Sequence, residues 1–395
     1  MELGYQAFDG DNHYYEALDA FTRHLDPKLG PRVIEWVEVN GRRYHALGGR
    51  VSRAVTNPTF DPIAPAGALV DYFRGNPEGR PMHELMGKAE PIRPEYRDRD
   101  ARLATMDAQG LARVWLFPTL GMLYEESLKH DPGAVVLLFR AFNRWLAEDW
   151  GMAYRDRIFA APYITLADVD EAVRELEWAL DQDARAVVLR AAAPITVAGP
   201  LSPAADAFDP FWARVNESGT RVAVHLGGAE YQKYGADWGE NPRAKYSEYN
   251  AFQWISYWSD RPIMDTVTAM VFHNLFGRFP EIKVLIAEFG TPWLPYLVRK
   301  LDHAALLGRK PKWGTLPARP SRIFKEHFVV APFPEENISR PMEIVGSDCL
   351  VFGSDFPHSE GLPDPVQYAS QLKGLDQPTV RKIMRDNLAN FLATG

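Results

Sequence analysis

From residue 102 onward, short apolar runs alternate with longer amphipathic stretches along the chain. The stretch 168–182 places Val169, Val173 and Leu176 on one side, which is the period of a helix packed on a sheet. Comparable patterns predict further helices at 133–150, 206–219 and 262–278. Apolar runs rich in β-branched residues predict strands at 6–11, 112–118, 158–164, 184–190, 221–226, 283–289, 326–331 and 350–354.

The order of these elements, strand followed by helix, predicts the architecture. Parallel strands need long crossover connections, and a helix is the usual crossover, so the alternation favours parallel pairing. Eight strands close into a barrel whose interior is filled by side chains, which favours a barrel over an open sheet. We therefore expect an α/β fold, a (β/α)8 TIM barrel, in which residues 1–395 form one domain.

Two segments exceed what a minimal barrel requires. Residues 20–99 are rich in Pro, Gly and Arg, and we interpret them as a long N-terminal insertion. Residues 229–261 follow the fifth expected strand and are rich in aromatic side chains, namely Tyr231, Tyr234, Trp238, Tyr246, Tyr249, Trp254, Tyr257 and Trp258. Long loops are usually functional or disordered, and so many aromatic residues argue against disorder. We expect a lid over a pocket or a contact in a homo-oligomer, where Tyr and Trp are also enriched.

Composition narrows the classes of function. The formal net charge is −8, so no basic excess is present for phosphate groups, and nucleic acid is not expected as a partner. No apolar run reaches the ~20 residues of a membrane span. Residues 1–10 lack the basic and apolar blocks of a signal peptide, so a cytoplasmic location is expected. The single Cys349 excludes an intramolecular disulfide and a thiolate metal cluster.

Polar residues that bind metals stand where several expected strands end. Asp11 and His13 lie two apart at the end of the first strand, so their side chains share a face. His225 ends the run 221–225, and Asp355 follows the run 350–354. In a barrel the carboxyl ends of all strands meet at one rim, and burying such groups there without a metal or a partner would be costly. These four residues therefore predict a metal site.

The sequence around these residues resembles a known family. The matching segments are Asp11-Asn12-His13, Val224-His225-Leu226, Arg278-Phe279-Pro280-Glu281-Ile282-Lys283 and Phe352-Gly353-Ser354-Asp355-Phe356-Pro357-His358. They resemble the amidohydrolase superfamily, and within it the amidohydrolase-related family that includes aminocarboxymuconate-semialdehyde decarboxylase and aromatic-acid decarboxylases. The resemblance runs from the first strand to the final helices, with residues 20–99 outside it. It implies a metal-dependent barrel whose ligands are Asp11, His13, His225 and Asp355.

Two departures from the family pattern bear on the reaction. Many members carry a proton-transferring histidine after the sixth strand, where this chain has Glu288. Glu288 is therefore a candidate acid or base, or a carboxylate ligand that would help to hold a second metal ion. Other superfamily members bridge two metals with a carboxylated lysine on the fourth strand, which here ends at Arg190. Arg190 is a candidate to bind a substrate carboxylate, with a structural ion pair as the alternative.

Three more polar residues lie near the expected site in the sequence. His358, three residues after Asp355, is expected at the rim as an acid or base or as a partner of the ligands. Glu16, three residues after His13, either accepts a hydrogen bond from that imidazole or is solvated. His273 falls inside an expected helix, where a structural role is favoured over metal binding.

Several functions remain compatible with this set of residues. Strand-end histidines and carboxylates suit one or two divalent ions such as Zn, Mn or Fe, which polarise a substrate oxygen or lower the pKa of a bound water. We expect first a metal-dependent hydrolase acting on an apolar or aromatic small molecule, because the decarboxylases' histidine after the sixth strand is missing. The alternatives are a decarboxylase (a C–C lyase) of an aromatic or unsaturated carboxylic acid, a non-haem iron oxygenase, and a barrel that binds without catalysis.

Overall fold

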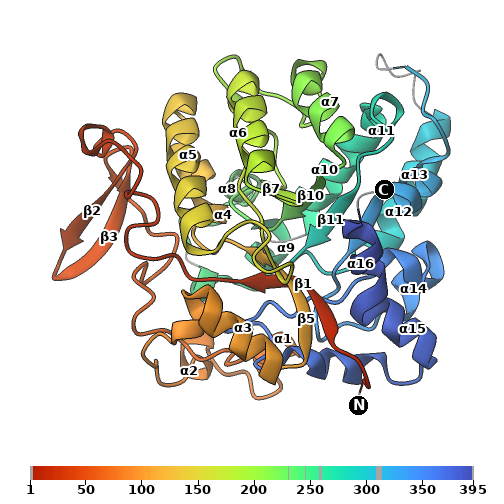
Figure 1. The fold of residues 1–395 in the computed structure, drawn as a ribbon, viewed down its shortest axis with the longest axis horizontal. Helices are drawn as coiled ribbons and strands as arrows, with labels where there is room; N and C mark the ends of the chain where they lie inside the picture. The colour runs from red at the N-terminus through yellow and green to blue at the C-terminus, as the bar shows by residue number, and fades with distance from the viewer. Residues whose placement is uncertain (1–2, 230, 245, 258–259, 308–313, 394–395) are drawn as a thin grey trace.

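A barrel of parallel strands lies at the centre of the protein (Figure 1). The computed structural model describes residues 3–229, 231–244, 246–257, 260–307 and 314–393. One sheet contains, in spatial order, β1 (Ala7–His13), β5 (Leu111–Phe117) and β6 (Ile158–Ala160). A second sheet contains β7 (Ala186–Arg190), β10 (Arg221–His225), β11 (Val284–Ala287) and β12 (Phe328–Val330), each paired in parallel with the next.

Single backbone bridges join the two sheets into a closed ring. The segment after β6 pairs with β7, and residues 350–356 fill the gap between β12 and β1. The parallel bridges are Tyr163↔Val188, Val330↔Leu350 and Asn12↔Phe356. The order of the elements around the ring is therefore that of an α/β barrel, as the alternation in the sequence predicts.

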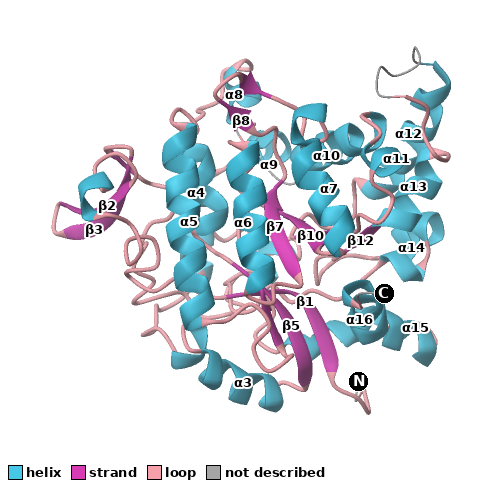
Figure 2. Ribbon diagram, turned by 45° about the horizontal axis from the view of Figure 1, so that its top comes forward, coloured by secondary structure: helices cyan, strands magenta, loops and turns pink. Residues whose placement is uncertain are grey.

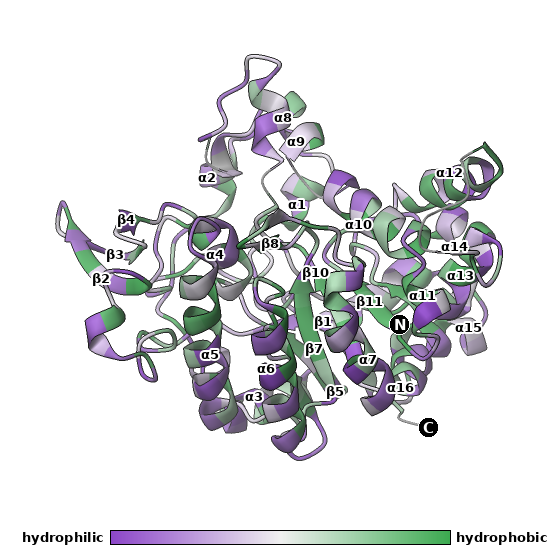
Figure 3. Ribbon diagram, turned by 90° about the horizontal axis from the view of Figure 1, so that it is seen from above, coloured by the Kyte–Doolittle hydropathy of each residue, from purple (hydrophilic) through white to green (hydrophobic). Residues whose placement is uncertain are grey.

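Helices surround the strands on the outside (Figure 2). The larger helices are α3 (Arg99–Ala108), α4 (Gly121–Leu128), α5 (Pro132–Asp149), α6 (Val169–Asp181), α7 (Asp209–Ser218), α10 (Asp260–Phe272), α12 (Leu294–Leu307) and α13 (Pro320–His327). Shorter helices complete the outer layer, namely α11 (Leu275–Arg278), α14 (Ser339–Val345), α15 (Gln377–Arg381) and α16 (Asn387–Leu392). The strands are apolar and the outer faces of α5, α6 and α7 are polar, which places the core between the two layers (Figure 3).

Local sequence signals set where these helices begin and end. Asp98, Asp131 and Asp168 each precede a helix, and each side chain accepts a hydrogen bond from a backbone N–H in the first turn. Pro132 occupies the first position of α5, where a missing N–H costs nothing. Gly219 ends α7 with a φ of 68°, a conformation that glycine adopts without strain. Strand β10 begins two residues later, so the end of α7 also sets where β10 starts.

Several of the expected elements differ from the structure. The strand expected at 326–331 starts at Phe328, because the two residues before it belong to α13. The run 350–354 contributes only isolated bridges instead of a continuous strand. The strand at 158–164 is shorter, since Ala160 ends β6. The helix at 262–278 is divided into α10 and α11 at Asn274, whose φ of 55° interrupts the helix.

The two long segments have structure of their own. Residues 20–98 include an antiparallel sheet of β2 (Ile34–Val39), β3 (Arg42–Leu47) and β4 (Arg50–Val51), whose hairpin projects at the left of Figure 1. They also contain the short helices α1 (Val70–Phe73) and α2 (Met82–Leu85). Residues 229–261 contain α8 (Gln232–Ala236) and α9 (Ala251–Tyr257), and Trp258 lies outside the described residues. A small hairpin of β8 (Ile195–Thr196) and β9 (Gly199–Pro200) follows β7.

Within the described part of the chain, none of the helices combines the length and apolarity required to span a membrane.

Candidate metal centre

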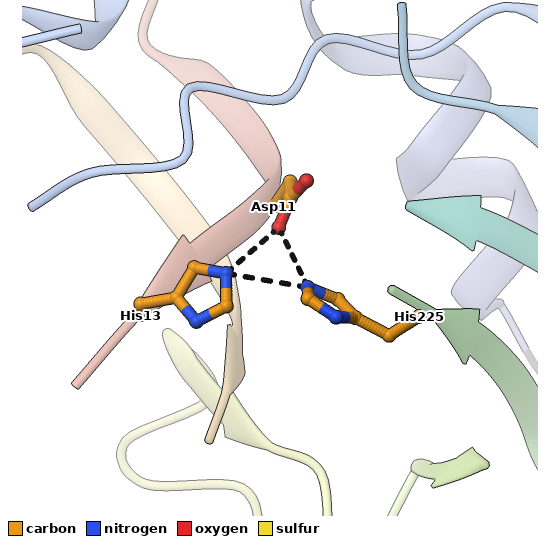
Figure 4. A group of neighbouring side chains, drawn as sticks. All are labelled: Asp11, His13 and His225. Carbon is orange, nitrogen blue, oxygen red and sulfur yellow. Dashed lines mark hydrogen bonds and ion pairs between the residues drawn. The ribbon is translucent and has the colours of Figure 1, made fainter. Parts of the chain in front are cut away.

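Two strands from different sheets of the barrel bring the first three predicted ligands together at its mouth. Asp11 and His13 project from the end of β1, and His225 is the last residue of β10. Their donor atoms face one another, as Figure 4 shows. His13 Nε2 and His225 Nε2 lie 3.3 Å and 3.4 Å from Asp11 Oδ1, and the two nitrogens are 3.2 Å apart.

These separations are those of donors around one small cation. Metal–ligand bonds of about 2.0–2.2 Å, at tetrahedral or octahedral angles, place neighbouring donor atoms about 2.8–3.6 Å apart. All three side chains are buried, and Asp11 Oδ1 has no hydrogen bond of suitable geometry among the described residues. An anionic oxygen buried without a donor is costly unless a cation compensates it. The three residues therefore form a buried site that fits a divalent metal ion.

Hydrogen bonding sets which ring nitrogen of His225 faces the cluster. Its Nδ1 lies 2.9 Å from the carbonyl oxygen of Leu226. Since a carbonyl can only accept, Nδ1 carries a hydrogen, which leaves Nε2 as the nitrogen that can bind a metal. Burial, followed by the neighbouring His358, holds the pKa of His13 well below its usual value, which favours the neutral form of that imidazole. Neutral imidazoles are the form that binds metals.

The fourth predicted ligand, Asp355, meets this group from one side. Its Oδ1 is 3.4 Å from His13 Nε2 and 2.6 Å from His358 Nδ1. Asp355 thus forms a second compact group with His13 and His358, adjoining the group of Asp11, His13 and His225. The ring of His358 lies over that of His13, with ring centroids 4.0 Å apart. The structure therefore places both Asp355 and His358 at the mouth of the barrel.

Glu288 also adjoins this group. It follows β11 directly, and its Oε2 is 3.4 Å from His225 Nε2 and 4.0 Å from His13 Nε2. With Asp355 and Glu360 it also forms an all-carboxylate group. Glu360 was not among the residues selected from the sequence, although it stands only two positions after His358. Glu288 therefore lies at the site, as expected, and it is close to Glu360, which the sequence did not single out.

Both flanking carboxylates have unusual backbone conformations. Glu288 has a φ of 59° and Asp355 a φ of 56°, in the left-handed region that residues other than glycine rarely adopt. Such conformations cost of order 1–3 kcal/mol each and persist where the surrounding structure holds them, often at functional sites. Gly353 permits the close approach of the two segments, because a Cβ there would lie 2.6 Å from Asp11 Cβ. The backbone is thus bent to aim these carboxylates at the group.

The buried carboxyl groups at the site shift one another's pKa values. Burial, and after it the Asp355 and Asp11 carboxylates, raise the pKa of Glu288 well above its usual value. Burial and Glu360 do the same for the pKa of Asp355. For Asp11, burial would raise the pKa, but the His13 and His225 imidazoles outweigh it and the net shift is downward. A bound cation would reverse the first two shifts, because it favours the ionised carboxylates.

We expect metal binding to release protons. Glu288 and Asp355, whose pKa values burial raises in the metal-free protein, keep their protons to higher pH than usual and must lose them beside a cation. Affinity should then rise as the pH rises, by about tenfold per pH unit for each proton released. Calorimetric titration with Mn²⁺ in two buffers of different ionisation enthalpy measures the number, which we expect to be about one to two. Equal heats in both buffers would contradict this expectation.

Arg190 is occupied by a structural network. Its Nη1 donates to Glu126 Oε2 at 2.7 Å and to the carbonyl oxygen of Gly228 at 2.9 Å. Glu125 Oε1 lies 3.5 Å from Nε, and the side chain is only 4% exposed. The guanidinium therefore holds the loop after β10 against α4, which is the ion-pair alternative. A substrate-binding role for Arg190 stays a prediction.

Glu16 and His273 also have structural environments. Glu16 Oε1 accepts hydrogen bonds from the backbone N–H groups of Thr119 (3.0 Å) and Gly121 (2.9 Å) at the start of α4. It is buried, so it is neither the solvated residue nor the acceptor for His13 that the sequence suggested. His273 lies in the turn between α10 and α11, which leads to the amino end of β11. That end is opposite the barrel mouth where the metal-binding group lies.

The aromatic segment reaches the site through Tyr246. Burial, and then the charges of Glu360, Glu288 and Asp355, raise the pKa of its phenol well above the usual value, so the ring lies within electrostatic reach of those carboxylates. Its ring centroid is 5.1 Å from that of Trp254 on α9. The outer side of the segment exposes other aromatic residues, such as Trp238, which is 79% exposed. The lid and the subunit contact therefore both remain predictions.

Comparisons with known proteins agree with this geometry. The sequence profile described as amidohydrolase matches residues 91–392. A crystal structure of an amidohydrolase from Mycobacterium avium subsp. paratuberculosis K-10 is 38% identical, with a TM-score of 0.92, over 99% of this chain and 100% of that chain.

Two more distant structures share the fold. Dihydroxybenzoic acid decarboxylase from Polaromonas sp. JS666, with bound manganese and the inhibitor 2-nitroresorcinol, is 17% identical with a TM-score of 0.61, over 82% of this chain and 93% of that chain. The 5-carboxyvanillate decarboxylase from Novosphingobium aromaticivorans DSM 12444, also complexed with manganese, is 15% identical with a TM-score of 0.62, over 99% and 97%.

Proposed function

Because this chain belongs to the amidohydrolase family, as a metal-dependent enzyme with a buried His/Asp site, we propose that it is a hydrolase of an apolar or aromatic small molecule. The proposal rests on the position of Asp355. Its Oδ1 faces His13 Nε2 at 3.4 Å and His358 Nδ1 at 2.6 Å. One carboxylate is therefore placed to accept a proton beside a cation and to share it with an imidazole.

The residues present define how a cation would be held. Asp11, His13 and His225 supply three donors, and the carboxyl groups of Glu288 and Asp355 adjoin them. A divalent zinc or manganese ion there would polarise a substrate carbonyl and lower the pKa of a water molecule. The mixed nitrogen and carboxylate donor set suits such ions.

Proton transfer is assigned to Asp355 and His358. The Thr119 hydroxyl donates to the carbonyl oxygen of Tyr14 at 2.7 Å, so toward His358 Nε2, 2.9 Å away, it can only accept. His358 Nε2 therefore carries a hydrogen, and Nδ1 is the atom that exchanges a proton with Asp355. During hydrolysis Asp355 Oδ1 accepts the proton of the attacking water, and the Asp355–His358 pair returns it to the leaving group.

Aromatic side chains near the carboxylates support the proposed substrate class. Tyr246 lies within electrostatic reach of Glu288 and Asp355, and Trp254 packs on it and on Phe73 of α1, with centroids 5.9 Å apart in the latter pair. The backbone N–H of Leu69, just before α1, donates to the carbonyl oxygen of Ser359 at 2.7 Å. Two segments distant in sequence thus bring flat apolar surfaces to the site, which suit an aromatic ring.

Decarboxylation of an aromatic acid is the second candidate. The manganese-bound decarboxylases that share this fold act on dihydroxybenzoic acid and 5-carboxyvanillate, according to their names. Such a reaction would require a proton for the ring carbon, and Glu288 is the carboxyl group placed to provide it. A cation beside Glu288 favours its ionised form, which is a poor donor, and hydrolysis therefore stays our first choice.

A substrate screen with two readouts separates these reactions. The protein loaded with Zn²⁺ or Mn²⁺ is incubated in ¹⁸O-labelled water with aromatic esters, amides and lactones, and with hydroxylated aromatic acids. Label in the product acid, lost in Asp355→Asn, is the expected result. Release of carbon dioxide, with no label incorporated into a product acid, would replace hydrolysis by decarboxylation. Two irons per chain together with consumption of dioxygen would contradict both candidates.

A further inference from the structure

A fully buried arginine lies behind the candidate metal site and takes no part in the proposed chemistry. Arg102, on α3, donates through Nη1 to Asn12 Oδ1 at 2.5 Å and through Nη2 to the carbonyl oxygen of His13 at 2.8 Å. Its Nε donates to the carbonyl oxygen of Glu95 at 2.7 Å. The described residues place no carboxylate within ion-pair distance of this guanidinium. Such a cation is costly to bury, which calls for a reason beyond packing.

Asn12 connects this cation to the buried carboxyl group of Asp9. Its Oδ1 accepts from Arg102, and its Nδ2 donates to Asp9 Oδ2 at 2.9 Å. The carboxamide therefore has only one orientation that satisfies both neighbours. The charge of Arg102 polarises the amide and strengthens both bonds. Asn12 is the residue between Asp11 and His13, so the two metal donors on β1 flank an anchored side chain.

The same residues mark an irregularity in β1. Asp9 pairs with Val114 and Asn12 with Leu116, so β1 uses one residue more than β5 over this stretch. An extra residue bends a strand and redirects the side chains around it, and such bulges are frequent beside active sites. The hydrogen bond between Asn12 and Asp9 spans the bulge, which sets how Asp11 is aimed.

Asp9 also fastens β1 to the segment that carries Asp355. Its Oδ1 accepts from the backbone N–H groups of Ser354 (3.0 Å) and Asp11 (3.2 Å), and its Oδ2 accepts from Ser354 Oγ. Ser354 immediately precedes Asp355. The hydrogen-bonded chain from Arg102 through Asn12 and Asp9 to Ser354 therefore touches the backbone next to Asp11, His13 and Asp355.

We propose that Arg102, Asn12 and Asp9 are positioning residues that hold Asp11 and His13 of β1 and Asp355 of the facing segment at the separations a divalent cation requires. This inference rests on the metal site in the proposed function. None of the three residues contributes a donor to the cation. Outer partners of metal ligands affect metal affinity by about 10–100-fold, and we expect effects of that size here.

A polarity exchange tests the proposal. Asn12→Asp alone sets two carboxylates against each other, and Asp9→Asn alone sets two amide groups against each other. The double variant Asn12→Asp/Asp9→Asn restores a donor–acceptor pair with the same total charge, and it gives Arg102 a carboxylate. We expect each single variant to bind Mn²⁺ about 10–100-fold more weakly by calorimetry and the double variant to recover most of that loss. The absorption spectrum of bound Co²⁺ should change and recover in parallel.

Milder variants cover the case in which a single exchange prevents folding. Ser354→Ala removes one hydroxyl from the chain and should weaken Mn²⁺ binding, whereas Thr220→Val, which removes a buried hydroxyl at the amino end of β10, should leave it unchanged. Variants with a lower melting temperature that bind Mn²⁺ and Co²⁺ as the unmodified protein does would overturn the proposal. A double variant that folds but binds Mn²⁺ no better than the single variants would also overturn it. Failure of the unmodified protein to bind Mn²⁺ would overturn the proposed metal site as well.

Discussion

Replacing His225 with alanine is expected to abolish metal binding and turnover while the barrel stays folded. The variant removes one of three donors that converge within 3.4 Å, and the remaining pair cannot hold a cation as tightly. Since even outer partners of ligands are worth about 10–100-fold, the loss of a direct ligand should exceed about 100-fold in affinity. The cost in stability should be about 1–3 kcal/mol, because Nδ1 of the ring bonds to the carbonyl oxygen of the adjacent residue Leu226 and not to a distant part of the barrel.

Metal content after dialysis, the melting temperature and turnover are measured on the same preparation. His303→Ala, an exposed histidine on α12, is the matched control and should keep metal and activity. If His225→Ala retains one metal ion per chain, the ligand assignment is wrong. If it does not fold, Asp11→Asn gives the same test, because that change keeps the size of the side chain.

Glu288→Gln is expected to keep the metal and to lose most of the turnover. The substitution keeps the shape of the side chain and removes a charge that lies 3.4 Å from His225 Nε2. If Glu288 moves a proton, turnover should fall on the order of 10²–10⁴-fold, the usual contribution of general acid or base catalysis. If it is a ligand as well, Mn²⁺ affinity will fall together with turnover, and the two measurements separate these roles.

The matched control lies at the other end of the same strand. Glu281→Gln, exposed before the amino end of β11, should change neither quantity. Near-normal turnover in Glu288→Gln would assign Glu288 a structural role and would remove the argument against decarboxylation. If turnover of the unmodified protein rises as the pH falls, and the variant lacks this pH dependence, Glu288 is favoured as a proton donor.

The sequence was informative where local chemistry determines structure. Alternating apolar runs predicted the strands, and the aspartates before α3, α5 and α6 are ordinary caps. The positions of Asp11, His13 and His225 followed from strand ends meeting at one rim, and the structure brings them together. The eighth strand was less predictable, because the left-handed backbone at Asp355 interrupts an apolar run that looks regular in the sequence.

Residues whose partners are distant in the sequence were harder to assign. For Arg190 the sequence left both a substrate-binding role and a structural ion pair open, since nothing near it in the chain identifies Glu126 and the carbonyl of Gly228 as its partners. Glu16 looked close to His13 along the chain, yet it caps α4. The role inferred for Asn12 was hidden for the same reason, because Arg102 lies 90 positions away.

The contact between β1 and the segment around Ser354 has a consequence for biosynthesis. Asp9 and Ser354 are 345 positions apart, so at about 5–20 residues per second a ribosome needs about 17–70 s between making one and making the other. During that interval β1 has no neighbour on one edge, and Asp11 and His13 stand without the backbone that anchors them. A nascent chain would therefore expose Asp11 and His13 to cellular metals before Asp355 has been made. We expect that selective metal binding requires the complete chain.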